Sequence, residues 1–153
     1  MPYYMTFFVD HPDKVAFADI ETGLKREDHN YHIDVLDRDV LDHFDTSNLY
    51  YGDEAYARIE INRPKEALFR SEIQERVEAV QDGGEGQTSR VIKILRQTNT
   101  IVRVHVLWQN RATELTLSSL QPLWDWLFLF RSGVLHADGE GFYDEEGMIV
   151  ETR

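Results

Sequence analysis

The segment Leu120–Phe130, with sequence LQPLWDWLFLF, constrains the fold of this chain more than any other feature. Apart from Gln121, Pro122 and Asp125, every residue in it is large and apolar. A helix formed here is hydrophobic around most of its circumference, so it has to be buried against other elements. It is too short to span a membrane, which takes roughly 20 apolar residues. The segment therefore predicts a core helix of a folded domain.

The residues that flank this segment predict where the helix begins and ends. Ser119 can accept a hydrogen bond from the first turn, and Pro122 fits that turn, where a missing N–H costs least. Arg131 suits the negative end of the helix dipole, and Gly133 suits a left-handed residue beyond the last turn. We expect a helix over 119–131, with Glu114–Leu117 extending the sheet before it.

The rest of the second part of the chain predicts an α+β fold. Alternating apolar and polar residues indicate strands at 56–61, 90–96 and 100–108, with closing strands at 134–137 and 142–150. Between the first two strands, the spacing of Phe69, Ile73, Val77 and Val80 predicts an amphipathic helix that opens near Pro64. The order over residues 56–150 is β-α-β-β-α-β, which is the ferredoxin-like arrangement of an antiparallel sheet with helices on one face.

Residues 1–53 predict an acidic, β-rich extension packed on that core. Strands are expected at 3–9, 15–20 and 31–35, a short helix around residues 40–44, and a loop at 47–53. The first 50 residues hold 11 acidic and 4 basic side chains, the largest share of the net charge. About 50 residues are too few to bury a core of their own, so we expect one domain over 1–153, with a split βαβ core at 54–153.

Composition narrows the classes of partner and of chemistry. The net charge of −12 would repel phosphate backbones and anionic lipid, so we expect neither nucleic acid nor a membrane as the partner. The chain has no cysteine, which excludes disulfides and thiolate chemistry. The first residues lack the features of a secretory signal. These features predict a soluble cytoplasmic protein.

Strand register places the candidate binding residues on one face of the predicted sheet. If Ile59 and Val104 face the helices, the opposite face carries a mostly basic set: Arg58, Glu60, Lys93, Arg103 and His105. We predict that this face binds a ligand or partner. Alternatively, the acidic extension folds over it and neutralises it. The stacking aromatics of RNA-binding sheets are missing from the predicted central strands.

Two clusters hold side chains that serve in metal or acid/base sites. The run His29–Asp45 is dense in imidazole and carboxylate groups, but its spacing matches no metal-binding signature and is typical of a solvated acidic face. His136, Asp138 and Glu140 alternate, as in an acid/base group or in a hairpin turn. The sequence holds no phosphate-binding loop, nucleophile elbow or HExxH motif. We expect no catalytic residue, no metal and no cofactor.

Three functions remain open on these grounds. The leading hypothesis is a small acidic protein without chemistry of its own that binds another protein, as an inhibitor or immunity-type protein binds a basic partner. The first alternative is a small-molecule enzyme or sensor with a pocket between the far sheet face and residues 1–50. The second is a structural subunit that forms a homodimer or larger homo-oligomer through its open sheet face.

Overall fold

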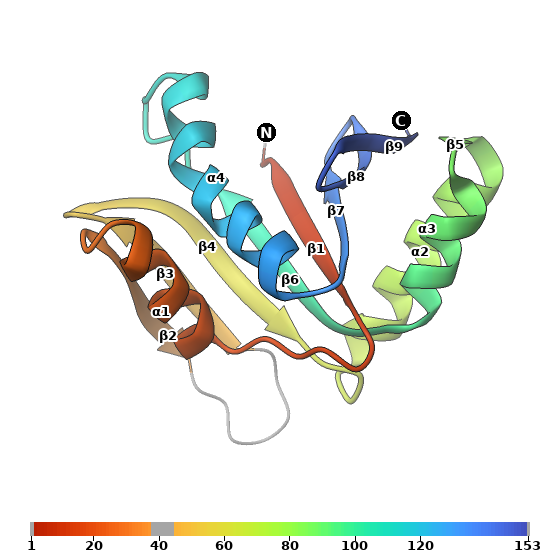
Figure 1. Cartoon of the computed structure of the whole chain (residues 1–153), viewed down its shortest axis with the longest axis horizontal. Helices are drawn as coiled ribbons and strands as arrows, with labels where there is room; N and C mark the ends of the chain where they lie inside the picture. The colour runs from red at the N-terminus through yellow and green to blue at the C-terminus, as the bar shows by residue number, and fades with distance from the viewer. Residues whose placement is uncertain (1, 38–44, 153) are drawn as a thin grey trace.

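The protein is built on one antiparallel sheet (Figure 1). In the residues that the computed structural model describes, 2–37 and 45–152, nine strands pair in the order β2-β3-β4-β6-β1-β7-β8-β9-β5. The strands are β1 (Tyr4–Asp10), β2 (Tyr31–Asp37), β3 (Asp45–Tyr51), β4 (Glu54–Asn62), β5 (Glu85–Gly86), β6 (Thr98–Val106), β7 (Gly133–Ala137), β8 (Gly141–Asp144) and β9 (Gly147–Glu151).

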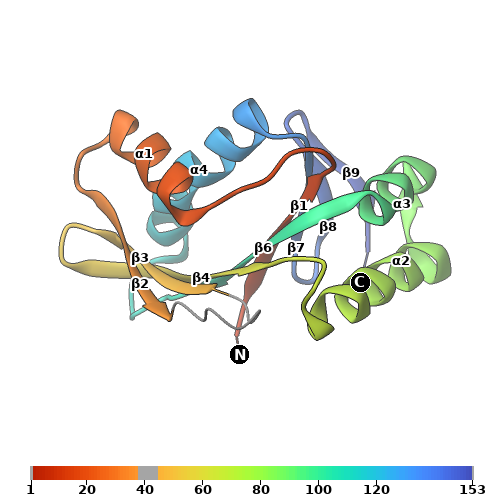
Figure 2. The ribbon, with the colours of Figure 1, turned by 90° about the horizontal axis from the view of Figure 1, so that it is seen from below.

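Helices pack on both faces of this sheet, as Figure 2 shows. Phe7 and Phe8 are consecutive residues of β1, so their side chains point to opposite faces, and both are 0% exposed. Phe7 packs in one hydrophobic cluster with residues of α1 (Phe17–Glu27) and α4 (Thr113–Phe130). Phe8 packs in a second cluster with residues of α2 (Ala67–Gly83) and α3 (Thr88–Arg96). We call these two sides of the sheet the α4 face and the far face.

The buried helix predicted from the apolar segment is α4, but it begins earlier than expected. Residues Glu114–Leu117 lie in the helix rather than in the sheet, and Ser119 donates to the Leu115 carbonyl instead of capping the helix. Pro122 therefore lies inside α4, where it removes a backbone donor. The Tyr31 hydroxyl donates to the Ser119 carbonyl at 2.7 Å, which supplies a donor close to the proline.

The end of α4 also differs from the prediction. Arg131 follows the last turn in an extended conformation, and Gly133 opens β7 instead of forming a left-handed helix cap. Gly133 has φ of 156°, and a Cβ placed there would overlap the Phe8 carbonyl oxygen. The close approach of β7 to β1 therefore requires this glycine.

The α+β class and most of the longer elements are confirmed. Strands β1, β2, β4, β6 and β7–β9 and helices α2 and α4 match predicted elements of the same type. The predicted strands at 15–20 and 90–96 are wrong because α1 and α3 occupy these segments, and the predicted loop at 47–53 is wrong because it largely forms β3. The ferredoxin-like arrangement is not confirmed, and the helices do not share one face. The helix expected around residues 40–44 lies outside the described residues.

The two mistaken strands are short runs in which strand and helix periodicity give similar patterns. In α3 the buried residues are Val91 and Leu95, which lie one helical turn apart. In α1 they include Phe17, Ile20 and Leu24, again at helical spacing. Two residues beyond Phe17, the Asp19 carboxylate accepts a hydrogen bond from the Ala16 backbone at 3.1 Å, which marks the helix start.

Residues 1–53 do not form an extension packed on the sheet, because they supply three of its strands. β1 lies between β6 and β7, while β2 and β3 continue the sheet beyond β4. β3 pairs along β4 from Asp45↔Ile61 to Tyr51↔Glu54, so the sheet is continuous across the expected boundary near residue 53. The assignment of a single domain stays a prediction.

The contact between α1 and α4 yields the first testable expectation. A Cβ at Gly23 of α1 would overlap the indole of Trp126 on α4. We expect Gly23→Ala to force the two helices apart and to lower the free energy of unfolding by about 1–3 kcal/mol, measured by urea denaturation.

The matched control is Gly83→Ala in α2, where no atom lies within 4 Å of the added Cβ. Alanine favours helices over glycine by up to ~1 kcal/mol, so this variant should be as stable as the wild type or more stable. Equal stability of both variants would show that the close packing of α1 on α4 does not contribute to the free energy of unfolding.

Candidate functional site

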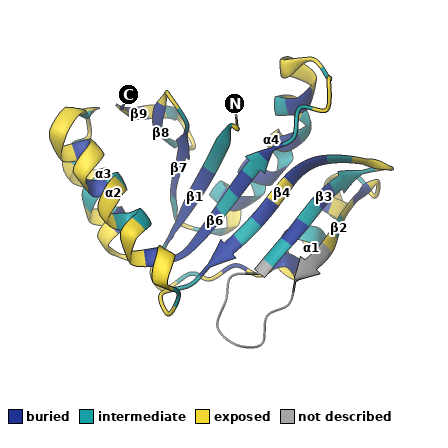
Figure 3. Cartoon of the chain, turned by 180° about the vertical axis from the view of Figure 1, so that it is seen from behind, coloured by how far each residue is buried: buried dark blue, intermediate teal, exposed yellow. Residues whose placement is uncertain are grey.

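The structure brings together four of the five binding residues predicted from the sequence. Arg58 pairs with His105 and Glu60 pairs with Arg103 across β4 and β6, which places all four on the far face. The predicted position of Lys93 on the sheet is wrong: Lys93 lies exposed on α3, because that segment is a helix and not a strand. Figure 3, which views the far face, shows α2 and α3 at one side of the sheet and no helix in front of β3 among the described residues.

The far face is less basic and more aromatic than the sequence predicted. The Arg103 guanidinium lies 4.1 Å from the centre of the Tyr4 ring and 4.0 Å from the Glu60 carboxylate. Tyr4 also stacks on His105 with 4.9 Å between ring centres. Farther along, Tyr50 of β3 stacks on a histidine of β2. The absence of stacking aromatics is therefore no argument against nucleic acid here, and that expectation rests on the acidic charge alone.

The described part of residues 1–53 does not cover this face as one alternative required. The described part of residues 1–50 contributes β1, β2 and β3 to the sheet and places α1 on the α4 face. The run His29–Asp45 lies partly outside the described residues. In the described chain, no group of three or more His, Asp or Glu side chains is arranged to hold a metal ion.

His136, Asp138 and Glu140 do not form a hydrogen-bonded acid/base group in the described structure. Asp138 accepts a hydrogen bond from the Tyr4 backbone at 2.9 Å, and no hydrogen bond joins His136 to either carboxylate. The His136 ring is buried on the far face of β7 against Phe142, and its Nε2 lies 3.5 Å from the Thr152 hydroxyl. Burial, with a smaller contribution from Arg76, lowers the pKa of the His136 imidazole to about 4. The imidazole is therefore neutral at pH 7, as a structural residue of the core.

This buried imidazole makes stability depend on pH. The unfolded chain binds a proton to His136 near pH 6.5, whereas the folded chain binds it near pH 4. Stability is therefore highest above pH 6.5 and falls as the pH drops toward 4, by on the order of 3 kcal/mol from this group. In urea unfolding from pH 7.5 to 4.5, His136→Gln should lose less stability than the wild type.

The control variant is His29→Gln, which removes an exposed imidazole. Its stability should follow the wild-type dependence on pH. If His136→Gln also followed the wild-type curve, acid destabilisation would have to come from other groups, and the buried neutral imidazole would not be its source.

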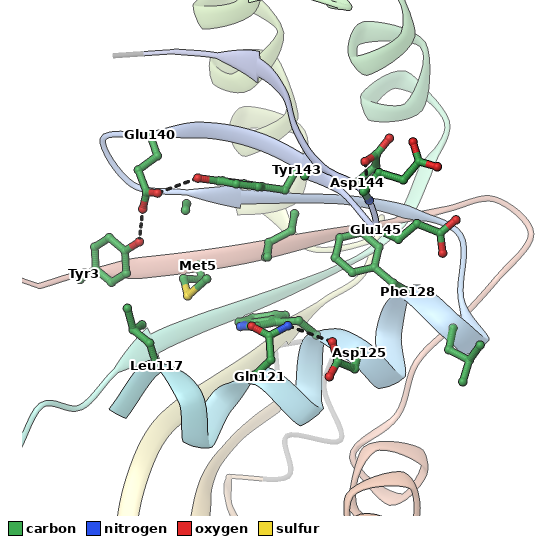
Figure 4. Close-up of a pocket in the computed structure, with 16 residues that line it drawn as sticks. Tyr3, Met5, Leu117, Gln121, Asp125, Phe128, Glu140, Tyr143, Asp144 and Glu145 are labelled. Atoms are coloured by element: carbon green, nitrogen blue, oxygen red, sulfur yellow. Dashed lines mark hydrogen bonds between the residues drawn. The ribbon is translucent and has the colours of Figure 1, made fainter. Parts of the chain in front are cut away.

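The α4 face carries a groove beside α4. It has a volume of about 660 Å³, within the range of ligand sites, and lies between α4, the strands β1, β7 and β8, and the turn from β8 to β9 (Figure 4). The elements that form it come from both ends of the chain. Its lining comprises Tyr3, Met5, Leu117, Gln121, Trp124, Asp125, Phe128, Leu129, Leu135, Ala137, Glu140, Tyr143, Asp144, Glu145, Glu146 and Gly147.

The floor and one wall of the groove are apolar. Met5 of β1 and Leu135 and Ala137 of β7 form the floor, because odd-numbered residues of these paired strands face α4. Phe128 and Leu129 contribute to the α4 wall, and the Leu129 side chain is 74% exposed. Removing such an exposed leucine from water is favourable, so a partner that covers it would be stabilised on the groove.

The rim of the groove is acidic. No lysine or arginine is among the described lining residues. The lining holds five carboxylates: Asp125, Glu140, Asp144, Glu145 and Glu146. Asp144 receives a hydrogen bond from Arg90 on α3 at 3.0 Å, so four carboxylates remain to attract a cation. Gln121 donates to Asp125 at 2.9 Å and orients that carboxylate along α4.

Glu140 is held in place by two tyrosines, as Figure 4 shows. The Tyr3 hydroxyl donates to Glu140 Oε2 at 2.6 Å, and the Tyr143 hydroxyl donates to Oε1 at 2.7 Å. Burial and this hydrogen bond raise the pKa of Tyr143 to about 12, and the same causes raise the pKa of Tyr3. Both phenols keep their protons at neutral pH, so they fix an acceptor with lone pairs left for a cation.

Sequence reasoning missed this groove because its residues run from Tyr3 to Gly147 and meet only through the pairing of β1 with β7. Two signals were available. The run Asp144–Glu146 is an acidic cluster beside a turn, and α4 is too apolar for a helix with one exposed side.

No helix in the described part of the chain is long and apolar enough to cross a membrane. Comparison with protein-family models, with curated proteins and with solved structures gives no match to this chain.

Proposed function

We propose that this protein acts by binding a basic protein partner through the α4 groove, without chemistry of its own. One observation carries the proposal: an apolar floor lies beneath a rim of five carboxylates that includes Glu140, Glu145 and Glu146, and the described lining holds no basic side chain. A partner that places apolar side chains on the floor and lysine or arginine at the rim would satisfy both parts. An inhibitor or immunity-type protein directed at a basic toxin or enzyme is one concrete form.

The charge of the whole molecule supports the same class of partner. The net charge of −12 would attract a basic protein over long range and speed its association. The groove would then fix its orientation, because five carboxylates and no basic side chain stand among its described lining residues. Exposed charges are screened by salt, so part of the affinity should be lost at high ionic strength.

Capture from an extract of the source cells tests the proposal with three immobilised proteins: wild type, E145K/E146K, and E27K/E78K. Glu27 and Glu78 are exposed on α1 and α2 and lie outside the groove lining, so both variants change the net charge equally. We expect wild type and E27K/E78K to retain the same basic protein at about 0.1 M salt, and E145K/E146K to retain on the order of tenfold less.

Raising the salt to about 0.5 M should weaken retention by the wild type. Equal retention by all three proteins would mean that net charge alone attracts the ligand and that the groove is not the site. Retention of acidic or neutral proteins by all three, insensitive to salt, would remove the proposal.

A cleft of about 360 Å³ between α2 and the far face favours the small-molecule alternative as a second candidate. It is lined by Tyr4, Arg103 and Asn62, and Asn62 Oδ1 is buried without a hydrogen-bond partner. A small polar ligand could bond to this oxygen and to the guanidinium.

Thermal shift against a library of small polar metabolites tests this second candidate. A ligand of the cleft should raise the Tm of the wild type and of Arg96→Ala, which alters an exposed residue of α3, but not the Tm of Arg103→Ala. An unchanged shift in Arg103→Ala would place the ligand elsewhere.

A further inference from the structure

We infer that the segment of the partner that fills the α4 groove is an amphipathic α-helix, with an apolar stripe and lysine or arginine at both ends of the stripe. The inference rests on the proposed function and names the form of the ligand.

The helices on the α4 face leave a place for one more. α1 packs against one side of α4, where Gly23 allows close approach to Trp126. The other side of α4 borders the groove with Leu117, Phe128 and Leu129. A helix that is apolar around most of its circumference has to be covered on more than one side. In the described chain, the groove side of α4 lacks the neighbour that α1 provides on the opposite side.

The width of the groove suits one helix. Its floor is formed by β1 and β7, and Tyr143 of β8 marks the far wall. Three adjacent strands span two intervals of about 4.8 Å, or roughly 10 Å in total. An α-helix with its side chains has a diameter of about 10–12 Å. One helix, and not two, can lie there with its apolar side chains inserted into the groove.

The pairing of the strands favours a helix over an extended peptide. β1 pairs with β6 and β7, β7 pairs with β1 and β8, and β8 pairs with β7 and β9. The floor is therefore the face of fully paired strands and offers no free strand edge. An extended segment on it would leave its own N–H and C=O groups without partners, whereas a helix satisfies them internally.

The positions of the carboxylates indicate where the partner helix carries basic residues. Glu140 precedes β8, and Glu145 and Glu146 follow it, so acidic groups lie at both ends of the apolar floor (Figure 4). The lining residues of α4 run from Leu117 to Leu129, which corresponds to roughly 18 Å of helix. A matching partner helix has about 12 residues, with apolar residues at positions i, i+3, i+4 and i+7 and basic residues near both ends.

Two synthetic peptides of the same composition test this inference. Each holds about 14 residues, leucine and lysine only, four helical turns in length. In one the leucines follow the helical period, and in the other leucine and lysine alternate as in a strand. By isothermal titration at about 0.15 M salt, we expect the helical-period peptide to bind the wild type at least tenfold more tightly than its isomer. Its helicity, followed by circular dichroism, should rise on binding.

Two leucine variants test where on the protein the peptide binds. Leu129 and Leu68 are both exposed, by 74% and 56%, but Leu68 lies on α2, away from the groove. Leu129→Lys should weaken binding of the helical-period peptide at least tenfold, and Leu68→Lys should leave it unchanged. Equal loss in both variants would mean that added charge acts over long range, which would overturn the placement.

The outcomes separate the inference from the function on which it rests. Tighter binding of the alternating peptide, equal binding of both peptides, or binding of neither would overturn the helix. Capture of a basic protein that depends on Glu145 and Glu146 would still support the proposed function in those cases. If the capture fails while the helical-period peptide binds at Leu129, the groove accepts a helix but the charge-based choice of a basic partner is wrong.

Discussion

The fold depends on the burial of β1 on both of its faces. Phe7 and Phe8 are adjacent in the chain and both 0% exposed, and β1 is paired on both edges, with β6 and β7. A central strand with large apolar side chains on both faces requires a helical layer on each face. α1 and α4 supply one layer, and α2 and α3 supply the other. The groove lies where α4 covers Phe7 through Phe128 and leaves Met5 of β1 only partly buried.

The sequence predicted the elements whose hydrophobic period is long and clear. β6 and α2 were found because nine and seventeen residues repeat a period of two or of 3.6. α3 was mistaken for a strand because nine residues with buried Val91 and Leu95 also hold Ile92 and Ile94, which alternate. That single error placed Lys93 on the sheet and produced the ferredoxin-like order. Long-range pairing, such as β1 between β6 and β7, has no local signal at all.

The shared face of the predicted far-face residues has a local signal in the sequence, whereas the convergence of the groove residues has none. Arg58, Glu60, Arg103 and His105 share a face because of strand alternation, which is local, and only the register between β4 and β6 had to come from the fold. The groove joins residue 3 to residue 147 through tertiary pairing. The sequence predicted a helix that is apolar on nearly all sides and has to be buried, but it did not predict that Leu129 stays exposed.

The apolar residues of α4 differ in how far they are buried. Leu120, Leu123 and Leu127 are fully buried and bind the helix to the sheet, whereas Leu129 and Phe130 are 74% and 52% exposed. Phe130 packs against the Trp126 ring, whereas Leu129 lines the groove, so burial of Leu129 by a partner would be favourable. Leu129 lines the groove together with Asp125 and Glu145, so two copies of the chain that met through their grooves would bring like charges together. The basic amphipathic partner that we propose would meet no such repulsion, because the same charges would attract it.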